Sequence, residues 1–218
     1  LFAKEYSSLG HKCAQVYTNA HCDFVYVVPL PTSDSSDLTD SLYQFVEAVG
    51  VPDVLVTDDA PSMTGVHTCF VKACRQLHIV RRVCLPHDHR ANRAEVSIKE
   101  LKKLWKKWMI HKDVPKCLWN FGLVHGGELL TRMIRRYDLR SGYQVVLGET
   151  PDISKWIEFG FYDYVWFLHT PTNDMLDKTT QIGRWLGAAH NVSSHLCYYV
   201  LSITGHVLAR STVRRVTD

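Results

Sequence analysis

Two acidic positions in the sequence suit metal-dependent chemistry. The pair Asp58-Asp59 follows the apolar run 54–56, and Glu95, separated from Asp58 by 36 residues, opens a long basic segment. A strand that ends in one acid and a later helix that presents another can bring two carboxylates to one edge of a sheet. Magnesium takes such oxygen ligands, and two ions can serve phosphoryl transfer. The spacing leaves another interpretation open, in which the acids merely suit a turn and a helix start.

The segments that carry these acids are predicted to alternate between strand and helix. Apolar runs predict strands at residues 11–20, 23–30, 54–56 and 79–85. Helical spacing predicts helices after the polar loop 31–36, over 66–77, from Asn92 onward, and as one further helical region over 113–140. After Pro151, short aromatic and β-branched runs at 161–169, 194–201 and 206–211 predict a small β-domain. We therefore divide the chain into a core, residues 1–147, and a small β-barrel domain, residues 148–218.

The helix from Asn92 is predicted to carry Glu95 beside a line of lysines. Its apolar residues recur at helical spacing and mark a buried face. Glu95, Lys99, Lys102 and Lys106 form an adjacent line at spacings of four, three and four. We expect these lysines to contact DNA phosphates. The alternative is that Glu95 and Lys99 are simply a stabilising helical pair.

The charges of the chain are strongly segregated although the net charge is only +3. Residues 31–60 contain seven acids and no lysine or arginine, whereas residues 99–140 contain eleven bases and four acids. This polarity suits a protein that binds a polyanion, although a lysine run is often only a solvated face. Further candidates for DNA contact are Arg135, Arg136, Arg214 and Arg215.

Composition excludes some classes of protein. With 46% hydrophobic residues in 218, the chain can form a sizeable core, but it has no apolar run of the ~18–20 residues that span a bilayer. Seven cysteines without regular spacing favour a reducing compartment over a disulfide framework. Twelve histidines are present, but they do not form the paired Cys and His spacing of structural zinc sites.

Several motifs resemble, in order, those of copia-type (Pseudoviridae-like) LTR retrotransposon integrases. The run Asn92-Arg93-Ala94-Glu95 resembles the family's Asn-Gly-Val-Ala-Glu with one residue fewer, and Val114–Trp119 resembles its P-x-x-L-W helix. The segments Gly148–Ile153 and Phe159-Gly160 resemble its G-x-x-P-D-(I/L)…F-G junction. The segments 184–187 and 198–207 resemble the small β-domain that follows.

The resemblance implies a ribonuclease-H-like α/β integrase core with a truncated first strand, followed by an all-β Src-homology-3-like barrel. It implies DNA 3′-end processing and strand transfer with Mg²⁺ or Mn²⁺, double-stranded DNA and a homo-oligomer as partners, no membrane association, and a nuclear location with a cytoplasmic particle stage. Asp58 and Glu95 match the catalytic and metal-binding acids. The family more often has Asn at the position of Asp59, so either Asp58 or Asp59 could face the metal. The first catalytic aspartate is expected immediately before Leu1.

Three alternatives remain at this point. An inactive or domesticated copy would bind DNA without catalysing a reaction. Because no residue of the chain matches the first catalytic aspartate, enzymatic activity is left open. A hydrolytic nuclease of the same fold would cut DNA without joining it. A protein-interaction module without nucleic acid is disfavoured by the basic segment 99–140.

Overall fold

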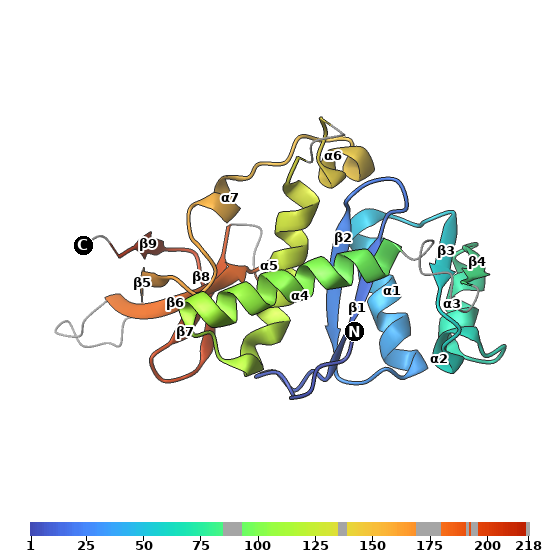
Figure 1. The fold of residues 1–218 in the computed structure, drawn as a ribbon, viewed down its shortest axis with the longest axis horizontal. Coiled ribbons are helices and arrows are strands. Elements are labelled where there is room, and N and C mark those ends of the chain that lie inside the picture. Colours follow the sequence, from blue (N-terminus) through green and yellow to red (C-terminus); the bar gives the residue numbers. More distant parts are fainter. Residues whose placement is uncertain (85–92, 135–138, 169–179, 191, 193–195, 217–218) are drawn as a thin grey trace. The chain divides into compact units, whose positions relative to one another are not determined.

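The computed structural model describes residues 1–84, 93–134, 139–168, 180–190, 192 and 196–216 (Figure 1). The chain separates into two compact units. The first comprises Leu1–Leu104 and Lys116–Pro151, and the second comprises Trp105–Pro115 and Asp152–Asp218. A domain boundary between residues 147 and 148 stays a prediction. Within the described part of the chain, no helix is both long and apolar enough to cross a membrane.

The first unit is built on an antiparallel hairpin of β1 (Cys13–Thr18) and β2 (Val25–Leu30). Side chains of a strand alternate between its two faces, and both faces of β2 are buried. Val28 and Leu30 belong to the core on one face, whereas Val25 and Val27 face α5 (Trp119–Arg132) on the other. The predicted strands at 11–20 and 23–30 thus form, although each is shorter than its apolar run.

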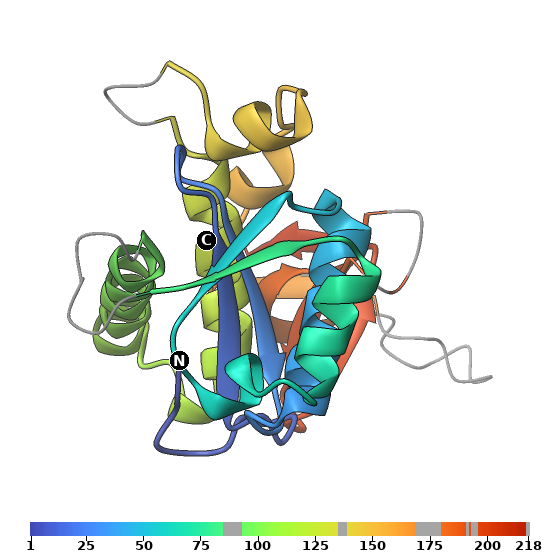
Figure 2. The same cartoon turned by 90° about the vertical axis from the view of Figure 1, so that its right-hand side faces the viewer.

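Helices cover the two faces of this hairpin, as Figure 2 shows. One face carries α1 (Ser35–Val49), α2 (Pro61–Thr64) and α3 (Cys69–Gln76). The ring of Tyr17 stacks on that of Phe45 of α1, with centroids 4.5 Å apart. The hydroxyl of Tyr17 lies 2.8 Å from the buried Ser41 Oγ of α1. This buried hydrogen bond fixes α1 over the hairpin.

On the opposite face, α5 follows the short helix η1 (Lys116–Leu118). Gly127 permits a close approach, because a Cβ there would lie 2.9 Å from Val27 Cγ2. Near the end of α5, the buried Thr131 Oγ1 donates to the Val25 carbonyl and accepts from the Val25 N–H, both at 2.8 Å. The helix ends at Arg132, so the prediction of one helical region over 113–140 was too long. A separate helix, α6 (Gly142–Leu147), begins at a Ser141 capping box.

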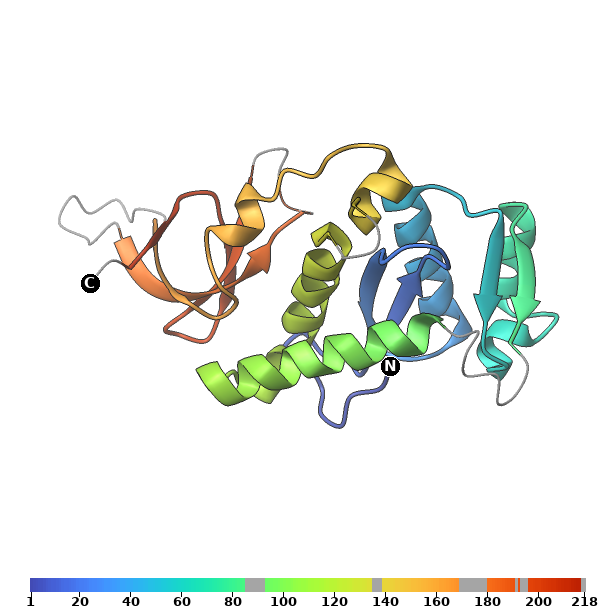
Figure 3. The same cartoon turned by 45° about the horizontal axis from the view of Figure 1, so that its top comes forward.

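A second pair of strands lies apart from the hairpin (Figure 3). Here β3 (Val54–Thr57) and β4 (Val80–Val83) run parallel. Residues 1–3 run along β1, through a bridge between Phe2 and Cys13 and two hydrogen bonds between Leu1 and Ala14. Residues 1–3 thus pair with β1 at the place where the resemblance implies a truncated first strand.

The long helix predicted from Asn92 is α4 (Arg93–Lys112). Leu101, on its predicted buried face, is fully buried. Its last turns belong to the second unit, where the Trp108 ring lies 4.8 Å from that of Phe161.

The second unit contains one antiparallel sheet with the strand order β8-β7-β6-β5-β9. Its strands are β5 (Tyr164–Leu168), β6 (Thr180–Ala188), β7 (Tyr198–Ser202), β8 (Val207–Arg210) and β9 (Val213–Arg215), preceded by α7 (Ser154–Ile157). The three predicted β-runs correspond to β5, β7 and β8, whereas β6 and β9 were missed. The predicted β-structure is present, and a Src-homology-3-like barrel stays a prediction.

Thr131 provides a test of how α5 is held to the hairpin. We expect Thr131→Val to lower the free energy of unfolding by about 2–6 kcal/mol, because both backbone groups of Val25 lose a buried partner at about 1–3 kcal/mol each. Thr131→Ser keeps the hydroxyl and should retain most of the stability. Urea denaturation of both variants measures the difference, and equal losses would contradict the hydrogen-bond explanation.

Candidate active site

Asp58 and Asp59 lie directly after β3, where the sequence placed them. Thr57, the last residue of β3, is buried, and its carbonyl accepts from Cys84 N at 2.8 Å. The Asp58 and Asp59 side chains are exposed. The strand therefore ends in two carboxylates that project into solvent from a fixed backbone. Carboxylates that leave room for water suit a hard cation such as Mg²⁺, which keeps part of its hydration.

Glu95 lies in the first turn of α4 and is half-buried. Two residues earlier, Arg93 Nη2 forms an ion pair with Asp23 Oδ1 at 2.9 Å. Asp23 belongs to the turn between β1 and β2, so this pair ties the start of α4 to the hairpin. No sequence signal indicated the pair, which joins positions 70 residues apart.

The amino group of Leu1 links the end of β3 to α4. Burial lowers the pKa of this amino group, the Cys13 thiol raises it, Lys102 lowers it further, and Asp58 raises it. Asp58 and Lys102 therefore act electrostatically on the same group. Lys102 lies seven residues after Glu95 on the same helix.

Lys99, Lys102 and Lys106 are all exposed on α4, as the predicted line requires. Lys103 and Lys107 are exposed on the same helix outside this line, and Lys103 Nζ lies 2.8 Å from Glu100 Oε1. The helix thus offers several cations to solvent, of which three share the line with Glu95.

The described residues do not contain a group of three or more His, Cys, Asp or Glu side chains that could hold a metal ion. Asp58, Asp59 and Glu95 supply suitable carboxylate oxygens, but not a complete set of ligands among the described residues. Residues 85–92, which connect β4 to α4, lie outside that part of the chain.

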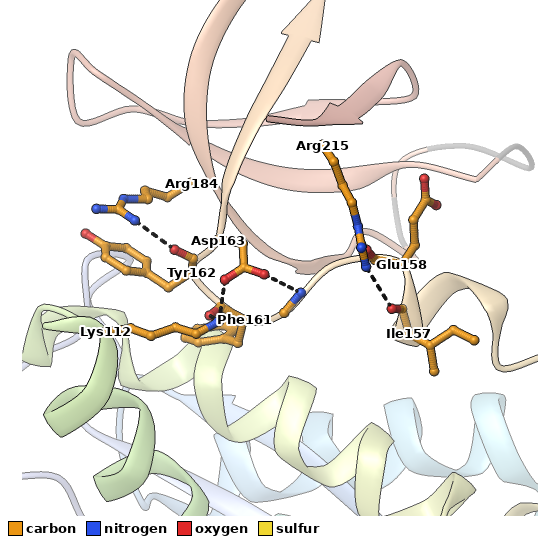
Figure 4. Close-up of polar contacts among 9 residues, drawn as sticks. Lys112, Ile157, Glu158, Phe161, Tyr162, Asp163, Arg184 and Arg215 are labelled. Carbon is orange, nitrogen blue, oxygen red and sulfur yellow. Dashed lines mark hydrogen bonds and ion pairs between the residues drawn. The ribbon is translucent and has the colours of Figure 1, made fainter. Parts of the chain in front are cut away.

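The predicted arginine contacts have different surroundings. Arg135 and Arg136 lie outside the described residues. Arg214 is exposed on β9, opposite Trp166 of β5. Arg215 instead donates to the carbonyls of Glu158 and, at 3.3 Å, Ile157, at the end of α7 (Figure 4). Part of its hydrogen-bonding capacity is therefore used within the chain.

Figure 4 also shows an anchor that the sequence did not reveal. Lys112, the last residue of α4, forms an ion pair with Asp163 and donates to the Phe161 carbonyl at 2.9 Å. Asp163 Oδ2 also accepts from Gly160 N at 2.8 Å. The end of α4 and the segment before β5 are thus held together within the second unit.

Comparison with solved structures identifies the fold. The chain is similar to a structure of the simian T-cell lymphotropic virus intasome in complex with PP2A regulatory subunit B56 gamma, with 16% identity, coverage of 94% of this chain and 72% of that chain, and a TM-score of 0.53. It is also similar to the HTLV-2 integrase catalytic core domain in complex with magnesium, with 17% identity, coverage of 65% and 89%, and a TM-score of 0.51. No protein-family profile and no curated protein matches the sequence. At this level of identity the similarity defines the fold, which is the ribonuclease-H-like α/β fold of retroviral integrase catalytic cores.

Proposed function

We propose that this chain is the catalytic core and small β-domain of a copia-type retrotransposon integrase. In the intact protein it would trim the ends of the element's DNA and join them to target DNA, as a homo-oligomer in the nucleus after a cytoplasmic particle stage. One observation carries the proposal: on an integrase-core fold, Asp58 lies exposed directly after β3, and Glu95 lies in the first turn of α4.

The proposed chemistry assigns a role to each group of side chains. Asp58 and Glu95 hold Mg²⁺ or Mn²⁺, with Asp59 as the other candidate beside β3. Divalent cations in such sites stabilise the attacking and leaving oxygens of a phosphoryl transfer. Lys99, Lys102 and Lys106 hold the phosphates of the DNA end beside these acids, since phosphate contacts position a duplex without reading its sequence.

The first catalytic acid is proposed to precede Leu1. Residues 1–3 pair with β1 up to Leu1, and the amino group of Leu1 lies within the electrostatic influence of Asp58. A residue directly before Leu1 would continue the pairing with β1.

A second candidate function is that of an inactive or domesticated integrase that binds DNA without chemistry. It is favoured by the incomplete set of ligands among the described residues. The two candidates differ in metal binding and catalysis, whereas both require the basic surface of α4.

Metal binding tests the assignment of Asp58 and Glu95. Asp58→Asn and Glu95→Gln should each weaken Mn²⁺ binding by about tenfold, because affinity follows the number of charged oxygen ligands. Asp53→Asn is the matched control, since Asp53 is also exposed but lies before the opposite end of β3. Electron paramagnetic resonance of free Mn²⁺ measures all three, and an equal effect of Asp53→Asn would refute the site.

Catalysis tests the proposed position of the first acid. We expect this 218-residue chain neither to trim nor to join labelled oligonucleotides with Mg²⁺ or Mn²⁺, because two of the three acids alone supply too few ligands for a metal pair. An upstream extension that supplies the aspartate should produce joined DNA, and Asp58→Asn in that extended protein should abolish it. Products that are cut but never joined would identify a nuclease, whereas activity of the shorter chain would contradict this prediction.

Salt dependence tests the line of lysines on α4. Changing Lys99, Lys102 and Lys106 to Glu should weaken binding to unrelated duplexes about equally and flatten the slope of log affinity against log salt concentration by about 0.9 per lost phosphate contact. Lys103→Glu with Lys107→Glu is the control on the same helix and should change the slope less. Circular dichroism checks folding, and an unchanged slope in the folded triple variant would show that these lysines are only solvated.

A further inference from the structure

The outer face of the sheet in the second unit has an unusual composition. Residues of β5 alternate, so that Val165 and Phe167 are buried while Tyr164, Trp166 and Leu168 are exposed. Aromatic side chains usually supply the apolar area of a core. Here two of them, Tyr164 and Trp166, are presented to solvent on neighbouring positions of one strand face.

Arginines flank these rings on the adjacent strands. In the strand register Trp166 is opposite Arg214 of β9, and Tyr164 is opposite Arg184 of β6. The Arg184 guanidinium lies 3.3 Å from the centroid of the Tyr164 ring and 4.6 Å from that of the Tyr162 ring. We call Tyr164, Trp166, Arg184 and Arg214 the aromatic platform.

Backbone geometry holds one edge of the platform in place. Tyr162 has a φ of 65°, in the left-handed region that non-glycine residues seldom adopt. Its N–H donates to the Trp185 carbonyl at 2.7 Å, and its carbonyl accepts from Arg184 Nη1 at 3.1 Å (Figure 4). Such strain persists only where surrounding contacts enforce it, and it clusters at functional sites.

The charge of the sheet indicates the chemistry of its partner. The five described strands contain four arginines, Arg184, Arg210, Arg214 and Arg215, and no aspartate or glutamate. A polyanion is therefore the complementary ligand. A polyanion that also offers flat aromatic groups can use the rings, and unpaired nucleic acid meets both requirements, because its bases are free to stack on aromatic side chains and on guanidinium planes.

We propose that the aromatic platform binds unpaired DNA, with one base stacked on Trp166 and the adjacent phosphates held by Arg214 and Arg184. This proposal rests on the proposed function only in that both involve DNA. It assigns unpaired DNA to this sheet, whereas the proposed function assigns duplex DNA to α4. Paired bases present only their edges, so a duplex cannot use the face of Trp166 in this way.

Substitution of Trp166 tests the stacking contact. In the full chain, Trp166→Ala should weaken binding to a labelled oligo-dT of about 20 nucleotides by about tenfold, as stacking contacts of this kind do. Binding to a duplex of equal length should change less than about twofold, because the lost contact is a base face. Trp166→Phe keeps a ring and should retain most of the affinity. Fluorescence anisotropy measures the affinity for each DNA in the presence of EDTA, which removes divalent cations. A failure of the proposed metal site therefore does not affect this measurement.

Leu168→Ala is the matched control. Leu168 lies on the same strand and face as Trp166 and is 42% exposed, against 40% for Trp166, so that loss of apolar area alone should leave oligo-dT binding within about twofold. Arg214→Ala should reduce the salt slope for oligo-dT by about 0.7, the value for one phosphate contact to a single strand. The proposal is overturned if Trp166→Ala binds oligo-dT like the wild type, if it weakens duplex binding equally, or if Leu168→Ala has the same effect. A change of oligomeric state in Trp166→Ala with unchanged oligo-dT binding would also overturn it, in favour of a contact between copies of the chain.

Discussion

The first unit depends on the burial of the β1–β2 hairpin on both faces. Apolar side chains project from both faces of β2, so that helices must cover each of them. The core on one face includes residues of α1 and α3 and also Ile79, next to the start of β4. The position of the β3–β4 pair, and with it the backbone of Asp58, therefore follows from the same packing that stabilises the hairpin. A close approach at Gly127 and the hydrogen bonds of Thr131 allow α5 to complete the other face.

Much of the first unit could be predicted because its elements have strong periodic signals. Loose alternation over residues 11–20 indicated β1, and the strand-like run 23–30 indicated β2. The predicted strand before Asp58 and the predicted helix from Asn92 placed the candidate acids correctly within their elements. In the second unit, the periodicity of apolar residues did not indicate β6 or β9. The nine residues of β6 include two glycines and a bulge between Trp185 and Gly187, which interrupts simple alternation. With three residues, β9 is too short to show any period.

Contacts between distant residues could not be predicted from the sequence. The pairs Arg93–Asp23 and Lys112–Asp163 lie at opposite ends of α4, and neither leaves a local pattern. Ion pairs at partly exposed positions contribute only about 0–1 kcal/mol to stability, so that they orient the helix ends and supply only a small part of the attachment. Apolar contacts provide the attachment: Leu101 is fully buried, and the Trp108 ring packs on that of Phe161.

The two units use different cations, and the difference has a physical basis. Helix α4 contains six lysines and one arginine, whereas the five strands of the second unit contain four arginines and no lysine. Lysine carries a compact charge on a flexible side chain, which can contact DNA phosphates whatever the base sequence. The planar guanidinium of arginine instead stacks on aromatic rings and pairs with phosphate in a fixed geometry. Two arginines of the sheet, Arg184 and Arg214, are opposite the exposed rings of Tyr164 and Trp166. Three lysines of α4 share their exposed line with the acid Glu95. This separation of lysine from arginine agrees with the two ligands that we propose, a duplex end beside the candidate metal-binding acids and an unpaired strand on the aromatic platform.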